Sequence, residues 1–72
     1  MQLFLFPNVH KVMKAEKICQ ANGIKSRVIP VPEHISSECG MCVLVETNDV
    51  EKCSALFAEN NIPFEMHDEE MT

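Results

Sequence analysis

The chain alternates between four short apolar segments and two longer amphipathic ones. Each short segment is rich in β-branched or aromatic residues and is flanked by Pro, Gly or Asn, which is typical of a strand. In the longer segments apolar residues recur every three or four positions, which indicates helices. The predicted strands cover residues 2–6, 26–31, 41–46 and 62–66, and the predicted helices cover residues 9–22 and 48–60.

The first predicted helix has a start signal, a stop signal and one apolar face. Asn8 precedes it and can cap its free backbone N–H groups, and Gly23 follows it as a typical C-terminal residue. Val12, Ala15 and Cys19 recur at helical spacing, so we expect them to face the core.

The second predicted helix carries a similar pattern. Asn48 followed by Glu51 fits an Asx variant of the capping box, so we expect the helix to begin there. Val50, Cys53 and Phe57 form its apolar face.

Two prolines help to arrange the strands. Pro30 and Pro63 lie in the second and fourth predicted strands, and proline is confined to sheet edges because it has no N–H to donate. The third strand is almost continuously apolar, which favours a central position. The order strand, helix, strand, strand, helix, strand is that of the α+β ferredoxin-like split βαβ (βαββαβ) sandwich, with a four-stranded antiparallel sheet and two helices on one face. In that fold the second and fourth strands lie at the edges, in agreement with the prolines.

The composition fits one small globular domain. Of the 72 residues 46% are hydrophobic and 24% charged, so we expect a single folded domain over residues 1–67 rather than a disordered chain. Residues 68–72 are acidic and close to the end of the chain, where we expect a frayed tail.

The charge and the lengths of the apolar segments exclude some classes of partner and some locations in the cell. A net charge of -5 argues against nucleic acid, which is bound through Lys and Arg, although five of the six basic residues lie between Lys11 and Arg27. No segment approaches the ~20 apolar residues of a membrane helix, and Met1–Val9 lacks the features of a signal peptide. We therefore expect a cytoplasmic protein whose cysteines are reduced thiols.

Three of the four cysteines fall at positions that favour packing. Cys19 and Cys53 lie on the apolar faces of the two predicted helices, and Cys42 lies within the third strand. Buried cysteine behaves as a small hydrophobic residue. We interpret these three side chains as parts of the core or of a sheet face.

Cys39 lies in a polar segment between two strands, where exposure is the usual expectation. Gly40 beside it leaves room for another group to approach the sulfur. Ser36 and Ser37 offer hydroxyl and amide groups that can hydrogen-bond an anion. This setting predicts a reactive thiol at Cys39, with the three neighbours supporting its loop.

The predicted topology adds a reason for reactivity. The first helix begins at the sheet edge that also holds the connection between the second and third strands, and a helix N-terminus carries about half a positive charge. His10 and Lys11 add to it. A thiol near that charge ionises more readily, and the thiolate is the nucleophile.

Cys39 and Cys42 form a C-x-x-C motif that invites other interpretations. A thioredoxin-type dithiol opens a helix, whereas this motif opens a strand. A zinc site needs two further ligands, and His10 and His34 do not have a standard spacing, so we predict no metal site. A reversible disulfide between the two cysteines stays open.

Four segments carry a resemblance to a known family. Residues 6–11, 14–17, 29–32 and 35–40 resemble the small bacterial proteins of the putative selenium/sulfur carrier-like family, over about residues 2–64. The most specific part is the Ser-Ser-x-Cys-Gly segment after a proline-bearing strand.

The resemblance implies a role in sulfur or selenium transfer. Such a protein holds the atom as a persulfide or selenopersulfide, here on Cys39, and passes it from a cysteine desulfurase-like donor to an acceptor protein. It needs no cofactor and is a carrier, or at most sulfurtransferase-like. The chain departs from the family pattern at Cys42, where an apolar residue is expected, so Cys42 is a candidate resolving thiol.

Two other functions compete with this one. A binding or regulatory module fits the ferredoxin-like fold, and Lys11, Lys14 and Lys17 form a row that can dock an acidic partner. A thiol-redox sensor would use Cys39 and Cys42. In either case an exposed sheet edge offers a surface for a homodimer.

Overall fold

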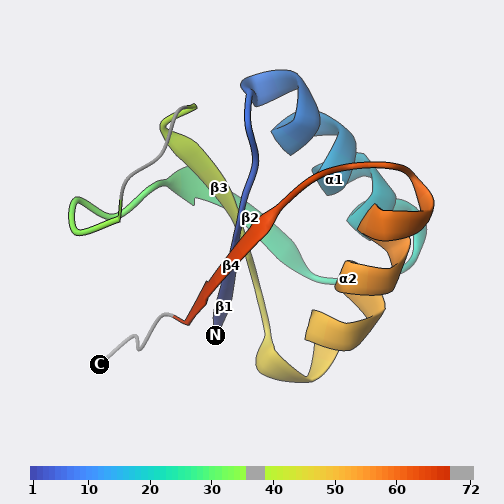
Figure 1. Cartoon of the computed structure of the whole chain (residues 1–72). Coiled ribbons are helices and arrows are strands. Elements are labelled where there is room, and N and C mark those ends of the chain that lie inside the picture. The colour runs from blue at the N-terminus through green and yellow to red at the C-terminus, as the bar shows by residue number, and fades with distance from the viewer. Residues whose placement is uncertain (36–38, 69–72) are drawn as a thin grey trace.

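The structure is a computed structural model that describes residues 1–35 and 39–68 of the chain. It contains four strands, two α-helices and one short 3₁₀ helix (Figure 1). Their bounds are β1 Gln2–Leu5, α1 Val9–Ala21, β2 Ser26–Pro30, β3 Met41–Val45, η1 Thr47–Asp49, α2 Val50–Glu59 and β4 Glu65–Asp68.

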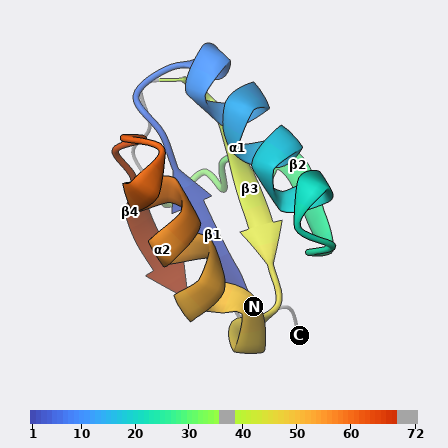
Figure 2. The same cartoon turned by 90° about the vertical axis from the view of Figure 1, so that its right-hand side faces the viewer.

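The four strands form one antiparallel sheet in the order β2-β3-β1-β4. Both helices cover the same face of this sheet (Figures 1 and 2). The predicted α+β ferredoxin-like arrangement is therefore confirmed, with β1 and β3 in the centre. Pro30 ends the edge strand β2, where its missing N–H interrupts no central ladder.

The main core lies between the sheet and the helices. Phe4 of β1 meets Phe57 of α2 edge to face, with ring centroids 5.1 Å apart. Phe6 and Phe64 complete an aromatic cluster around Phe57, an arrangement whose quadrupole attraction adds to the burial of apolar area. The predicted buried face of α1, formed by Val12, Ala15 and Cys19, is confirmed.

The opposite face of the sheet is also covered. Leu3 and Leu5 of β1 lie there with Cys42 and Leu44 of β3, and all four are buried. Residues of β2 and of the β2–β3 connection pack over them, namely Ile29, Val31 and Ile35. We call this side the loop-covered face, since the connection takes the place of a third layer.

Both helices end in the same backbone motif. In α1 the Ile24 N–H donates to Cys19 O at 2.9 Å and the Gly23 N–H to Gln20 O, with Gly23 at a positive φ of 69°. This pair of bonds is a Schellman motif, which satisfies carbonyls at the helix end. In α2 the same bonds run from Ile62 to Phe57 and from Asn61 to Ala58, and Asn61 has a φ of 57°.

The predicted starts of two elements were wrong. Helix α2 begins at Val50 rather than Asn48, because Thr47–Asp49 forms a 3₁₀ turn whose backbone bond from Asp49 N–H to Glu46 O replaces a side-chain cap. Strand β4 begins at Glu65 rather than at residue 62. The N–H of Ile62 is used in the Schellman motif and Pro63 has no N–H, so the chain joins β1 only after these residues.

Candidate functional site

The start of α1 and the end of the β2–β3 connection lie at the same edge of the sheet. Leu5, the last residue of β1, pairs with Cys42, so the chain before Cys42 runs beside the chain that leads into α1. Both views show this proximity (Figures 1 and 2). The register therefore places the β2–β3 connection and the chain that leads into α1 at one end of the sheet, and the proximity of the Cys39 sulfur to the first turn of α1 stays a prediction.

The side chain of Cys39 is half-buried, whereas exposure was expected. It packs against the core on the helix side, and its Sγ donates to Met41 O at 2.9 Å. The Gly40 carbonyl accepts from Val31 N–H on the β2 side, and successive carbonyls of an extended chain point to opposite sides. The Met41 carbonyl therefore points toward β1, which places the thiol on the side where α1 begins.

The contact with Met41 has a chemical consequence. A carbonyl oxygen can accept from an S–H group but repels a thiolate. Only the protonated form of Cys39 can therefore keep this bond. A nucleophilic Cys39 must rotate away from the carbonyl before it attacks.

Gly40 gives the loop its shape. Its φ is 76°, in the left-handed region that glycine occupies without steric cost. A Cβ built there would meet no atom of the described structure within 4 Å, so the glycine is required by the backbone conformation and not by crowding. The predicted supporting residues Ser36 and Ser37 lie outside the described residues.

The first turn of α1 has a positive electrostatic character. Asn8 caps it as predicted, accepting from the Lys11 N–H at 3.0 Å. The turn contains no acidic residue, and His10 is exposed within it. By contrast, α2 carries Glu51 in its first turn, which offsets the positive end of that helix. The structure thus brings Cys39, Gly40, His10 and Lys11 to one edge.

The structure does not bring Cys39 and Cys42 together on one face. Cys39 packs on the helix side, whereas Cys42 is fully buried on the loop-covered face among Leu3, Leu5 and Leu44. A disulfide between the two cysteines requires one side chain to leave its face. This geometry disfavours the redox-sensor interpretation.

Cys19 and Cys53 form a second pair of thiols, between α1 and α2. Both are fully buried, and their side chains hydrogen-bond to one another. Burial raises the pKa of Cys19, and burial followed by the neighbouring Cys19 raises the pKa of Cys53 to about 12. These thiols stay protonated at neutral pH, so their chemistry is that of packing residues.

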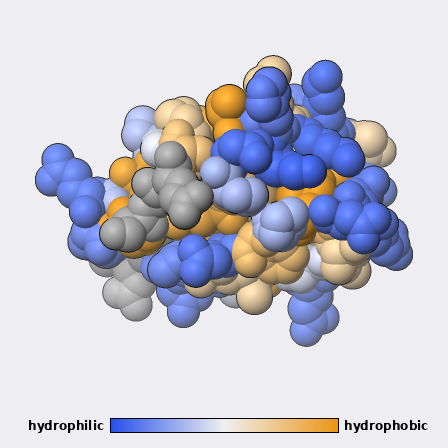
Figure 3. Space-filling model, turned by 45° about the horizontal axis from the view of Figure 1, so that its top comes forward, coloured by the Kyte–Doolittle hydropathy of each residue, from blue (hydrophilic) through white to orange (hydrophobic). Residues whose placement is uncertain are grey.

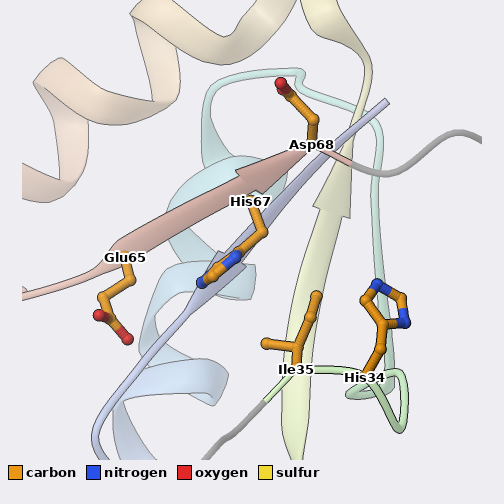
Figure 4. Close-up of a pocket in the computed structure, with 5 residues that line it drawn as sticks. All are labelled: His34, Ile35, Glu65, His67 and Asp68. Carbon is orange, nitrogen blue, oxygen red and sulfur yellow. The ribbon is translucent and has the colours of Figure 1, made fainter.

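Sequence reasoning missed a groove on the loop-covered face. It has a volume of about 430 Å³ and lies between the β2–β3 connection and β4 (Figure 4). Glu65 and His67 pair with Leu5 and Leu3 of β1, which places both side chains on this face. The alternation within β4 was the available signal, but the strand had been predicted too early in the chain. The lining residues are His34, Ile35, Glu65, His67 and Asp68.

The described residues contain neither a metal-binding group nor a membrane-spanning helix. Within residues 1–35 and 39–68, no group of three or more His, Cys, Asp or Glu side chains is arranged to hold a metal ion. Neither helix in that part of the chain has the length and apolar character needed to cross a membrane.

Comparison with known proteins identifies the family. The search of curated proteins and the search of solved structures returned no match. One family model, described as "Putative Se/S carrier protein-like", matches residues 2–67. This range contains the whole sheet up to His67, both helices and Cys39, so the match covers the site as well as the fold. The chain belongs to this family of selenium/sulfur carrier-like proteins.

Proposed function

We propose that the protein carries a sulfur or selenium atom on Cys39, as a persulfide or selenopersulfide, and passes it to an acceptor protein. The family name supports a selenium or sulfur carrier. The observation that carries the assignment to Cys39 is the burial of its side chain compared with that of the other three cysteines. Of the four, all of which lie within the described residues, Cys39 is the one that is not buried.

The transfer needs no external oxidant or reductant. The Cys39 thiolate attacks the outer sulfur of a persulfide on a donor protein. The donor S–S bond breaks, its electron pair stays on the donor cysteine, and that thiolate takes up a proton. A new S–S bond joins Cys39 to the transferred atom, and an acceptor thiolate later repeats the attack.

The positive end of α1 supports both charged states of this cycle. A thiolate and a persulfide anion are each stabilised near a helix N-terminus, and the first turn of α1 adds Lys11 and His10 without an opposing acid. An S–S bond is about 2.05 Å long, so the outer atom of the loaded form extends beyond the sulfur that now contacts the Met41 carbonyl. Gly40, Ser36 and Ser37 support the loop in this proposal.

The cycle calls for two protein partners. We propose a cysteine desulfurase-like donor and a thiol-bearing acceptor, both in the cytoplasm, where thiols stay reduced. Cys42 takes no direct part while it remains buried on the loop-covered face. The alternative function is a binding or regulatory module without carrier chemistry. A negative result in the following experiment would favour this alternative.

The experiment compares two cysteine variants by mass spectrometry. Reduced protein is incubated with sodium polysulfide, or with a purified cysteine desulfurase and L-cysteine, then alkylated and digested. We expect an addition of about 32 Da on the peptide of Cys39, its loss in Cys39→Ser, and its retention in the matched control Cys42→Val. Loading that persists in Cys39→Ser, or an unmodified wild-type Cys39 under both donors, would contradict the proposal.

A further inference from the structure

One face of α1 is exposed over two turns and mixes apolar with basic side chains. Val9 and Met13 are one turn apart, and 47% and 52% of their surfaces are exposed. His10, Lys14 and Lys17 are exposed beside them. We call these five residues the α1 face. Figure 3 looks down on the end of the molecule where α1 begins, and hydrophobic side chains reach its surface among hydrophilic ones.

The exposed apolar residues are not explained by the fold. The core side of α1 is complete without them, since Val12, Ala15 and Cys19 are buried against the sheet and α2. A solvent-facing helix surface is ordinarily polar. Isolated exposed apolar residues are common, but Val9 and Met13 lie one turn apart and form a small apolar contact area with a polar rim, the arrangement of a protein interface.

The charge of this face is opposite to that of the chain. The protein has a net charge of -5, yet the α1 face contains Lys14 and Lys17 and no acid, and Glu16, the acid of α1, is half-buried. The basic face therefore stands out on an acidic molecule. Such a distribution attracts the acidic surface of a partner to this face, while the acidic remainder of the molecule repels that surface.

The α1 face begins at the edge that holds Cys39. A donor must bring its persulfide to the Cys39 sulfur, so its contact surface has to surround this edge. From Val9 to Lys17 the helix rises about 12 Å at 1.5 Å per residue, which is a suitable length for one side of a small protein contact. The first turn of α1 follows the end of β1 that pairs with the start of β3, so it lies at the same end of the sheet as the site.

We propose that the α1 face is the docking surface for the persulfide-donor protein, whose complementary surface is acidic around an apolar contact. This inference rests on the proposed carrier function. Val9 and Met13 supply the apolar contact, and the three basic side chains orient the partner around it. An anionic membrane would need deeper apolar insertion than two side chains provide.

The experiment separates docking from chemistry by using two sulfur donors. The rate of Cys39 persulfide formation is measured with purified cysteine desulfurase and L-cysteine, and separately with sodium polysulfide, which needs no docking. The test variant is Lys14→Glu/Lys17→Glu. The matched control is Lys25→Glu/Lys52→Glu, which changes the net charge equally but lies outside the α1 face.

We expect the test variant to lower the desulfurase-dependent rate about tenfold at low salt, while the polysulfide rate stays within twofold of wild type. Added NaCl should slow the wild-type reaction and leave the test variant little changed. The control variant should behave like wild type with both donors. Val9→Ser/Met13→Ser should lower the desulfurase-dependent rate without changing its salt dependence.

The opposing outcomes are distinct. Equal slowing by the test and control variants, or desulfurase-dependent loading that is insensitive to both, would overturn the docking proposal. So would polysulfide loading of wild type without loading by the desulfurase, or binding of anionic vesicles that the test variant abolishes while desulfurase loading persists. Failure of both polysulfide and the desulfurase to load Cys39 would instead contradict the carrier function itself.

Discussion

The cysteine side chains of this protein lie in two opposite environments, one at Cys39 and the other at the Cys19–Cys53 pair. Cys39 is half-buried, at the same end of the sheet as the positive end of α1. Cys19 and Cys53 are fully buried between the helices, where burial raises the pKa of both thiols. The comparison teaches that cysteine number alone says little about reactivity. Solvent access and local charge decide which thiol can become a nucleophile.

The largest expected difference is in alkylation rate. The pKa of Cys53 rises from 9.0 to about 12, which reduces its thiolate at pH 8 about a thousandfold before access is considered. We expect iodoacetamide to label Cys39 rapidly in the native protein and to label Cys53 only through unfolding. Peptide mapping after timed labelling measures both rates, and urea-unfolded protein is the control. Equal native rates would break the comparison.

The same pKa shift predicts a loss of stability at high pH. The unfolded chain releases the Cys53 proton above pH 9.0, whereas the folded protein holds it up to about pH 12. Stability from this thiol is therefore complete below pH 9 and falls between pH 9 and 12, by up to about 1.4 kcal/mol per pH unit. Urea unfolding at several pH values should show this fall, and Cys53→Ala should reduce it.

Replacement of a cysteine by alanine should change the free energy of unfolding differently in the two environments. We expect Cys53→Ala to lower the free energy of unfolding by about 2 kcal/mol, because it leaves a cavity in the main core. Cys39→Ala should cost less than about 1 kcal/mol, because the side chain is half-buried, while abolishing persulfide loading. Chemical denaturation measures both. A larger loss in Cys39→Ala would assign Cys39 a packing role.

Gly40→Ala sharpens the comparison at the loop. A residue with a side chain pays about 1–2 kcal/mol in the left-handed region, and Gly40 has a φ of 76°. We expect a loss of that size in the free energy of unfolding and a slower loading of Cys39. Because the added Cβ would meet open space, unchanged stability would mean that the loop readily adopts another conformation.

The smallest expected effect lies at the two helix ends. Gly23 and Asn61 occupy equivalent left-handed positions. Glycine suits this position better than asparagine, so Asn61→Gly should raise the free energy of unfolding by about 0.5 kcal/mol, and Gly23→Ala should lower it by about 1 kcal/mol. Thermal unfolding of both variants tests this. Opposite signs would show that the left-handed backbone conformation does not limit stability at these two positions.

Most of the fold could be predicted because the sequence features that specify its helices and strands are local. The repeat of Val12, Ala15 and Cys19 assigned a helix face correctly, and Pro30 assigned an edge strand. The start of β4 was wrong because Ile62 serves the end of α2, a role that depends on a Schellman geometry rather than on hydrophobicity.

The site was predictable in part. Its place at the edge beside α1 follows from the topology, and the register agrees with it. The half-burial of Cys39 and its bond to the Met41 carbonyl depend on how the connection folds back over the sheet, which no periodic pattern encodes. The separation of Cys39 from Cys42 follows strand alternation, which places Cys39 and Met41 on the helix side and Cys42 on the loop-covered face, and sequence analysis overlooked this signal. In addition, the C-x-x-C spacing suggested proximity of the two cysteines.

If Cys39 carries the atom as proposed, its hydrogen bond to Met41 O gives the empty and the loaded protein different shapes. In the proposed cycle, the protonated empty form keeps its thiol against the strand, whereas an anionic persulfide is repelled by the same carbonyl. An acceptor protein would therefore meet a different surface on the loaded carrier than on the protonated, empty one. Discrimination between full and empty carriers would then need no separate recognition element, since one backbone oxygen reports the occupancy of the sulfur.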